Sequence, residues 1–215
     1  NQFNQMNILE LNKKAWDKIG ENTASPYIKH EKYLGVFNLF CNKLPKNASV
    51  LDFGCGPGIP FTKELVMRGF MVTAIDISKT MIKEAKKNVP EANYAEVSMT
   101  DIDFHNDFDG VFSGYTMLCL DPENFKIAAK KAVESLKQNG LFFLALNEPP
   151  PEGHDESENY TKIMGQSMYS RPYTEDEVRK VFEKLNMKIV KVARERVTSE
   201  AYGNEYTLLV LMQKQ

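Results

Sequence analysis

The sequence predicts an α/β fold, in which a doubly wound, mostly parallel sheet of seven strands has helices on both faces and an antiparallel last strand. Short apolar runs alternate with helical patterns of ten or more residues along the 215-residue chain, and this alternation indicates crossovers between parallel strands. A glycine-rich turn at residues 54–58 joins the first strand to a helix, which is where open α/β sheets bind ligands. The last two apolar runs flank a turn signal, Gly203-Asn204, as neighbouring strands would.

The amino-terminal third is expected to hold three helices and one strand. Apolar side chains recur at helical spacing in the first two segments, and the strand is short, apolar and β-branched. Pro60 fits only the first turn of a helix, and Gly69 can end that helix. The expected elements are helices at residues 7–19 and 28–44, a strand at 49–53 and a helix at 59–68.

The alternation continues through the centre of the chain. Asp121 is a suitable amino-terminal cap with Pro122 at the first helical position, and Asn139-Gly140 is expected to end that helix. The expected elements are strands at residues 70–75, 92–97, 108–113 and 141–146, and helices at 78–88 and 121–138.

The pattern fails between residues 147 and 172. This stretch contains three consecutive prolines followed by several acidic residues, and a long unstructured excursion in a compact domain is usually a functional lid or a mobile loop. Beyond it, Thr174 and Glu177 resemble a capping box. The expected closing elements are a helix at residues 174–185 and strands at 188–193 and 206–212.

Composition excludes several classes of protein. The 27 basic and 29 acidic side chains give a net charge of −2, so there is no general electrostatic attraction to nucleic acid or to an anionic membrane. The longest apolar run, residues 141–146, is far shorter than the roughly 20 residues of a membrane-spanning helix. The first residues show no secretory signal. The 3 cysteines and 3 histidines are scattered, which argues against structural zinc and favours a reducing compartment.

The turn at residues 54–58, Gly-Cys-Gly-Pro-Gly, is the most informative segment. Glycines let a ligand lying across the end of a strand approach the backbone more closely than any Cβ allows. Asp76 ends the next expected strand, where a carboxylate can accept hydrogen bonds from both hydroxyls of a ribose. Ile59 stands where a dinucleotide fingerprint needs glycine, and no Gly-Lys-Ser or Gly-Lys-Thr follows. The pattern predicts a nucleoside without phosphates, and the alternative is a tight turn that binds nothing.

Four segments resemble the motifs of the class I S-adenosylmethionine-dependent methyltransferases, small-molecule type. The resemblance is close over residues 45–147 and extends to the carboxyl-terminal elements only by pattern. It implies a Rossmann-like fold and S-adenosylmethionine as the cofactor. The segments are Leu-Asp-Phe-Gly-Cys-Gly-Pro-Gly at 51–58, Ala-Ile-Asp-Ile-Ser at 74–78 with Met81 following, Phe-Asp-Gly-Val-Phe-Ser at 108–113, and Gly-Leu-Phe-Phe at 140–143.

The resemblance also implies roles for individual residues. The glycine turn would contact the methionine portion of the cofactor, and Asp52 would hold the loop or, through water, the amino group. Asp76 would bind the ribose, while Ile77 and Met81 would sandwich the adenine, although plain core packing is almost as good a reading of Met81. The implied cofactor-binding residues are Tyr27, Asp52, Gly54, Gly56, Gly58, Asp76, Ile77, Met81, Ser98, Met99, Ser113 and Gly114.

Two registers are open for the adenine edge. In one, Ser98 stands where the family often has an acid, and Met99 supplies a backbone contact. Shifting the register by three residues would make Asp101 the adenine ligand instead. The sequence does not decide between the two.

The acceptor side is less defined. Methyl transfer from a sulfonium depends mainly on alignment, so a general base is optional and no catalytic residue is named. Cys119 stands where many relatives have a histidine, which puts histidine-based catalysis there in doubt. The acids of the expected lid disfavour a nucleic-acid substrate. The expected substrate-binding residues are Tyr115, Glu148, Tyr169 and Tyr173.

The predicted function is transfer of a methyl group from S-adenosylmethionine to an oxygen, nitrogen or carbon of a small molecule. The alternatives are a non-catalytic S-adenosylmethionine-binding protein and an NAD-dependent oxidoreductase, which Ile59 disfavours. We expect a cytoplasmic monomer or homodimer without metal, membrane or nucleic-acid partners. A single domain, 1–215, is expected to comprise leading helices (1–44), a cofactor-binding core (45–147), a lid (148–173) and a closing helix with strands (174–215).

Overall fold

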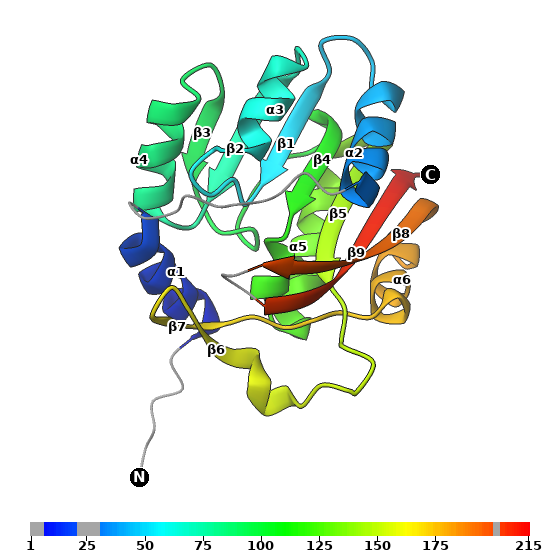
Figure 1. The fold of residues 1–215 in the computed structure, drawn as a ribbon. Coiled ribbons are helices and arrows are strands. Elements are labelled where there is room, and N and C mark those ends of the chain that lie inside the picture. The colour runs from blue at the N-terminus through cyan, green and yellow to red at the C-terminus, as the bar shows by residue number, and fades with distance from the viewer. Residues whose placement is uncertain (1–6, 21–30, 200–202) are drawn as a thin grey trace.

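One twisted sheet of seven strands forms the centre of the molecule (Figure 1). The computed structural model describes residues 7–20, 31–199 and 203–215. The strand order is β3-β2-β1-β4-β5-β9-β8. The strands are β1 (Ser49–Phe53), β2 (Met71–Asp76), β3 (Asn93–Glu96), β4 (Phe108–Gly114), β5 (Leu136–Asn147), β8 (Met187–Ser199) and β9 (Gly203–Lys214).

The first five strands of the sheet are parallel, and β9 runs antiparallel to both β5 and β8. This arrangement confirms the predicted doubly wound fold with an antiparallel last strand. Because parallel strands end at one edge, the turns after β1, β2 and β4 lie together there.

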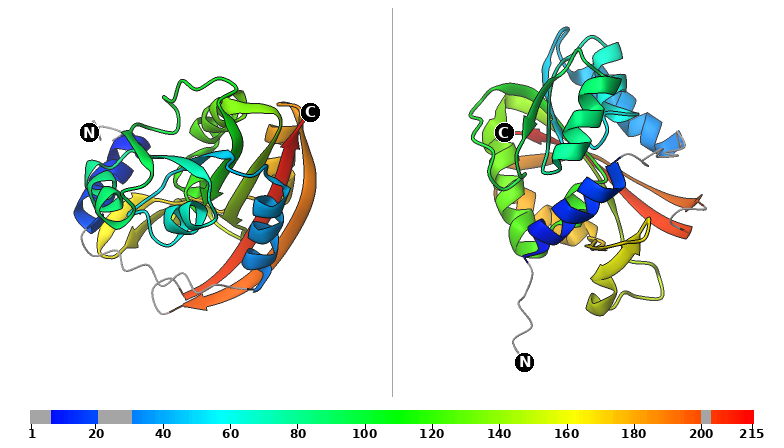
Figure 2. Two further views of the ribbon diagram at one scale, coloured as in Figure 1. Left: turned by 90° about the horizontal axis from the view of Figure 1, so that it is seen from above. Right: turned by 90° about the vertical axis from the view of Figure 1, so that its left-hand side faces the viewer.

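Helices cover both faces of the sheet, and each face has its own apolar core. In the right-hand view of Figure 2, α4 and α5 lie on opposite sides of the sheet. Phe37, Phe112 and Phe143 pack in one core, and Phe125, Phe142 and Phe182 in the other, because neighbouring residues of a strand face opposite sides. The helices are α1 (Ile8–Ile19), α2 (Glu31–Lys43), α3 (Phe61–Met67), α4 (Lys79–Asn88), α5 (Pro122–Ser135) and α6 (Glu175–Glu183).

The helix predicted at residues 121–138 ends earlier than expected. It begins after an Asp121 cap, as predicted, but stops at Ser135, and the chain enters β5 at Leu136. Leu136 pairs with Phe108 across a register shift. Asn139 has a φ of 63°, so the Asn-Gly pair bends the beginning of β5 instead of ending the helix.

The expectation of an unstructured excursion at residues 147–172 is wrong. A short helical turn, η3 (Glu156–Asn159), leads into a hairpin of β6 (Tyr160–Ile163) and β7 (Gln166–Tyr169). Met164 and Gly165 at its tip have φ values of 49° and 79°, as in the tight turns of two-residue hairpins. Sequence reasoning missed the hairpin because methionine is not a usual signal for a left-handed turn position.

The closing strands are longer than predicted. β8 and β9 pair along their whole described lengths, from Met187–Lys214 to Ser199–Gly203. Charged residues such as Arg194 and Arg196 interrupt the apolar pattern there. The strand predicted from periodicity therefore ended at residue 193, before the observed end of β8. No helix in the described ranges is long and apolar enough to cross a membrane.

Candidate active site

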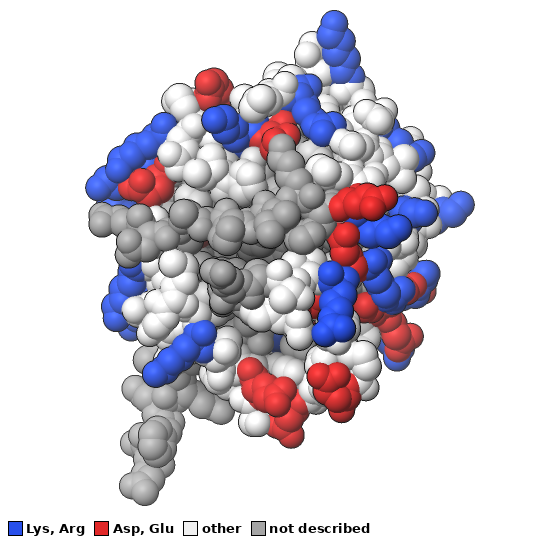
Figure 3. All heavy atoms as spheres, viewed as in Figure 1, with Lys and Arg blue, Asp and Glu red and all other residues white. Residues whose placement is uncertain are grey.

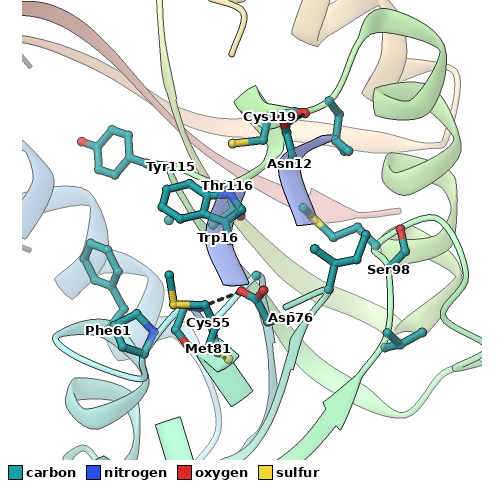
Figure 4. Close-up of a pocket in the computed structure, with 18 of the residues that line it drawn as sticks. Asn12, Trp16, Cys55, Phe61, Asp76, Met81, Ser98, Tyr115, Thr116 and Cys119 are labelled. Atoms are coloured by element: carbon teal, nitrogen blue, oxygen red, sulfur yellow. Dashed lines mark hydrogen bonds between the residues drawn. The ribbon is translucent and has the colours of Figure 1, made fainter. Parts of the chain in front are cut away.

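A pocket lies at the carboxyl ends of β1, β2 and β4, and α1 closes one side of it (Figure 4). Its lining comes from five places in the chain: α1, the turn after β1, the end of β2 with α4, the segment after β3, and the segment after β4. The lining residues are Leu9, Asn12, Trp16, Gly54, Cys55, Gly56, Pro57, Ile59, Phe61, Asp76, Ile77, Met81, Val97, Ser98, Met99, Gly114, Tyr115, Thr116, Cys119 and Leu120.

The three glycines of the turn have left-handed backbones but different surroundings. A Cβ on Gly54 would lie 2.7 Å from the Thr116 side chain, so this glycine permits the crossing of two loops. A Cβ on Gly56 would meet nothing within 4 Å, because Gly56 lines the open pocket. The prediction that Gly58 contacts the cofactor is not supported, since a Cβ there would lie 3.2 Å from Ala85 of α4 and Gly58 is not in the pocket wall.

Asp76 is the polar centre of the pocket. One carboxylate oxygen accepts a hydrogen bond from the backbone N–H of Gly56 at 2.9 Å, and the other accepts one from Ser78 N–H, also at 2.9 Å. Burial raises the pKa of Asp76 to about 6, although backbone hydrogen bonds from Ser78, Gly56 and Ile77 oppose that shift. A carboxylate has about four lone-pair positions, so the group can still accept a hydrogen bond from a ligand.

The segment that follows β3 shows which of the two registers considered for the adenine edge faces the pocket. Ser98 and Met99 line the wall together with Ile77 and Met81. Asp101 is exposed and is not part of this wall. The Ser98 hydroxyl lies 2.9 Å from the Thr100 hydroxyl and accepts the Thr100 N–H at 3.2 Å, which fixes the turn at the edge of the pocket.

The other end of the pocket is formed by the segment after β4. Tyr115 has a φ of 59°, a strained conformation for a bulky residue. Burial raises the pKa of the Cys119 thiol to about 12, so this side chain is not a thiolate nucleophile near neutral pH. Gly114 is in the wall, whereas Ser113 is fully buried behind it, 3.1 Å from the Thr116 hydroxyl. Ser113, which was expected beside the methyl end of the cofactor, is therefore not part of the described pocket wall.

Asp52 lies behind the glycine turn and outside the pocket wall. It is fully buried and accepts a 2.6 Å hydrogen bond from the Thr62 hydroxyl of α3. Burial raises the pKa of Asp52 to about 7, against the effect of Thr62. Of the two roles expected for Asp52, the contact with α3 supports holding the loop.

Three of the four residues expected to bind the acceptor are absent from the described pocket wall, and only Tyr115 lies in it. Glu148 accepts hydrogen bonds of 3.0 and 2.8 Å from Arg194 Nε. The Tyr173 hydroxyl donates to the Leu120 carbonyl at 2.5 Å, and its ring stacks on Phe125. Tyr169 is buried in the hairpin. Tyr27 lies outside the described residues.

Sequence reasoning missed the contribution of α1 to the pocket. Leu9, Asn12 and Trp16 line the wall. The buried Asn12 amide donates to the carbonyls of Cys119 and Tyr169, both at 2.9 Å, and accepts the Tyr169 N–H at 2.8 Å. A polar residue within the apolar stripe of a helix was the signal that could have identified this position.

Comparison with known proteins shows a likeness to methyltransferases over the core of the chain. Residues 50–140 match the model of a methyltransferase domain, and they include the strands and turns that form the pocket. Over these residues the chain is similar to methyltransferase domains. It is 30% identical over 113 residues to YqeM of Bacillus subtilis (strain 168), which is provisionally named a methyltransferase. The match covers 53% of this chain and 42% of YqeM, so it spans less than half of that relative.

Solved structures share the fold of this chain. An S-adenosylmethionine-dependent methyltransferase of Methanosarcina mazei superposes with a TM-score of 0.74 at 19% identity, over 82% of this chain and 96% of that one. The 1,6-didemethyltoxoflavin-N1-methyltransferase of Burkholderia thailandensis, solved with 1,6-didemethyltoxoflavin and S-adenosylhomocysteine, gives 0.71 at 18% identity, over 95% and 88%. These likenesses establish the fold.

Proposed function

We propose that this chain binds S-adenosylmethionine in the pocket around Asp76 and transfers the methyl group to a small-molecule acceptor. The observation that carries the proposal is that Asp76 and Gly56 of the glycine turn line the same pocket and are joined by a hydrogen bond. The carboxylate is fixed by backbone N–H groups and keeps acceptor capacity for a ligand. A ribose presents two adjacent hydroxyl donors, which fit this arrangement.

The surrounding residues fit the remaining parts of that cofactor. Apolar side chains of Ile77 and Met81 would bind the faces of the adenine, and the wall at Ser98 and Met99 would meet its edge. The open space in front of Gly56 would take the methionine portion. The reacting end would then face Gly114 and Tyr115.

When bound, the cofactor would supply an activated methyl group, and Asp76, Ile77 and Met81 would hold the nucleoside part of the cofactor. The chain's own contribution is alignment and exclusion of water. Trp16 of α1 and Tyr115 close the pocket from different elements, and such positioning can supply roughly 7 to 11 kcal/mol in favourable cases. A general base is optional when alignment carries the transfer, so the proposal assigns no catalytic residue.

The surface supports a small acceptor over a nucleic acid. Basic and acidic side chains alternate on the face of Figure 3, and acidic ones lie along its lower edge, so the described residues form no continuous basic surface there. The helix α1, which lines the pocket, also packs against β7. All three cysteines are unpaired thiols, which supports the proposal of a cytoplasmic protein.

Binding and turnover separate this proposal from its alternatives. Calorimetry is expected to show that S-adenosylmethionine and S-adenosylhomocysteine bind, and that NAD does not. A screen of small acceptors by homocysteine release, with the coupled hydrolase in excess, is expected to find turnover. Cofactor binding without turnover on any acceptor would indicate a binding protein, and NAD binding alone would reverse the assignment.

A further inference from the structure

The sheet carries a row of polar side chains immediately beyond the pocket. Asn147, the last residue of β5, pairs with Thr207 of β9, which pairs with Glu195 of β8. Glu205 lies two residues before Thr207 and therefore on the same face of β9. This is the face covered by α2, because Ala145, Leu209 and Ala193 belong to the core that α2 joins. We call Asn147, Glu195, Glu205 and Thr207 the polar row.

Hydrogen bonds inside the polar row leave buried acceptors unused. The Asn147 amide donates to Glu205 Oε1 at 3.0 Å, and the Thr207 hydroxyl donates to the Glu195 carbonyl at 3.0 Å. Asn147 Oδ1 and Glu195 Oε2 are buried and have no partner among the described residues. Buried polar atoms are rarely left unsatisfied without a ligand, ion or water to explain them.

The hydroxyl of Tyr33 on α2 is a third buried atom without a hydrogen-bond partner among the described residues. The Tyr33 side chain is 8% exposed. The Tyr33 ring stacks on Tyr115, with centroids 6.4 Å apart. Three of the four buried unpartnered side-chain atoms in the described structure thus belong to the polar row and to Tyr33.

Tyr115 connects the polar row to the pocket. Its backbone N–H donates to the Ala145 carbonyl of β5 at 3.0 Å, its ring lines the pocket, and its hydroxyl hydrogen-bonds to Thr207. Figure 4 shows this hydroxyl pointing away from Asp76. The polar row therefore begins where the reacting end of the pocket stops, at the carboxyl edge where ligands of such sheets bind.

The Glu195 carboxylate is not paired with the arginines beside it on β8. Arg194, next to Glu195 in sequence, points to the opposite face and pairs with Glu148 and Glu175. Arg196 lies over the Tyr206 ring. The unpartnered oxygens of the Glu195 carboxylate and the Asn147 amide favour a ligand that donates hydrogen bonds and carries positive charge.

We propose that the polar row binds a protonated amine of the methyl acceptor. This inference rests on the proposed function, because it assigns the acceptor class of the same site. A protonated amine has no free lone pair, so this nitrogen anchors the acceptor and the methyl group goes to another atom of the molecule. Asn147 Oδ1 and Glu195 Oε2 receive its N–H groups, and Tyr115 separates the anchor from the cofactor.

The test compares acceptor analogues that differ only in the ammonium group. Tyramine and 4-ethylphenol form one pair, and histamine and 4-ethylimidazole form a second. Calorimetry on the full chain saturated with S-adenosylhomocysteine is expected to show at least about tenfold tighter binding of the ammonium compound in one or both pairs. Equal affinity within both pairs, or no binding by either ammonium compound, would overturn the proposal.

Two variants test whether the polar row is responsible for the preference for ammonium compounds. Glu195→Gln keeps the shape of the side chain and removes its charge, so the ammonium advantage is expected to fall to about threefold or less. Glu91→Gln makes the same change at an exposed residue outside the pocket wall and should keep the full advantage. Unchanged selectivity in Glu195→Gln would also overturn the proposal. Binding of S-adenosylhomocysteine to the wild-type chain is measured first. If the wild-type chain does not bind it, the proposed function itself is contradicted. If the chain binds it but does not prefer the ammonium compounds, only this inference is contradicted.

Discussion

Two buried carboxyl groups, Asp52 and Asp76, show how residues of one type acquire different roles. Asp76 faces the pocket and is held by backbone N–H groups on both oxygens. Asp52 lies behind the turn and is held by the Thr62 hydroxyl. Only Asp76 has acceptor capacity directed at a cavity. The sequence identified both positions, but the different surroundings decide which one can bind a ribose.

Asp76→Asn is expected to weaken S-adenosylhomocysteine binding by about 1 to 3 kcal/mol, because the ribose hydroxyls lose a charged acceptor. Calorimetry measures the change, and circular dichroism checks that the fold is intact. Asp101→Asn makes the same substitution at an exposed residue outside the pocket wall and should leave the affinity unchanged. If the two variants behaved alike, Asp76 would not be the ribose ligand.

The glycine turn offers a second prediction at the residue scale. Gly58→Ala should reduce the free energy of unfolding by roughly 1 to 3 kcal/mol, because the new methyl group meets Ala85 and the φ of 80° is unfavourable for alanine. Gly56→Ala places its methyl group toward the pocket and should weaken S-adenosylhomocysteine binding about tenfold or more.

Urea unfolding and calorimetry on both glycine variants separate the two effects. Weak cofactor binding in Gly58→Ala with normal stability would contradict the assignment of Gly58 to helix packing.

The raised pKa values of Asp52 and Asp76 predict how stability depends on pH. Between about pH 4 and 7 the folded protein retains protons that the unfolded chain has released, so the free energy of unfolding falls as pH rises. Each group contributes at most about 1.4 kcal/mol per pH unit. Urea unfolding without cofactor at pH 5, 6 and 7 should show this decline, and Asp52→Asn should make it shallower. A decline of the same slope in the variant would show that Asp52 is not the titrating group.

At the scale of elements, α1 bridges two sides of the pocket. The Asn12 side chain of this helix hydrogen-bonds to the Cys119 carbonyl and to the backbone of β7. One turn and a residue later, Asp17 accepts a 2.6 Å hydrogen bond from the Ser78 hydroxyl and a 3.3 Å bond from the Thr80 N–H. Thus one helix ties the loop that follows Asp76 to the segment at the opposite end of the cavity.

Asn12→Leu removes three hydrogen bonds, two of them buried, while keeping a side chain of similar size. We expect it to lower the free energy of unfolding by roughly 2 to 4 kcal/mol and to weaken S-adenosylhomocysteine binding, because α1 lines the pocket. Glu10→Gln on the exposed face of the same helix should cost under about 0.5 kcal/mol. Full cofactor affinity in folded Asn12→Leu would show that docking of α1 does not shape the pocket.

The elements also show where sequence reasoning works. β1 was predicted with its observed bounds, since a buried parallel strand is a short apolar run ended by a glycine. The β6–β7 hairpin was not predicted, because both strands have only four residues and β6 is mostly exposed. Position in the chain could not reveal that Asn12 would reach Tyr169, a contact across 157 residues. Contacts that depend on tertiary packing have no local signal.

At the scale of the whole molecule, the fold brings two sites to one edge of a single sheet. The parallel half, β3-β2-β1-β4-β5, carries the glycine turn and Asp76, and these were predictable because their roles depend on the backbone at strand ends. The antiparallel half, β9 and β8, supplies the polar row. The sequence did not indicate that row, because its members come together only through the registers of β5, β8 and β9.

The most direct test of the account is a crystal structure of the protein soaked with S-adenosylhomocysteine. We predict density for the nucleoside in the pocket, with the ribose hydroxyls within hydrogen-bonding distance of the Asp76 carboxylate and the adenine between Ile77 and Met81. Density for the nucleoside at any other place on the molecule, with this pocket empty, would contradict the account.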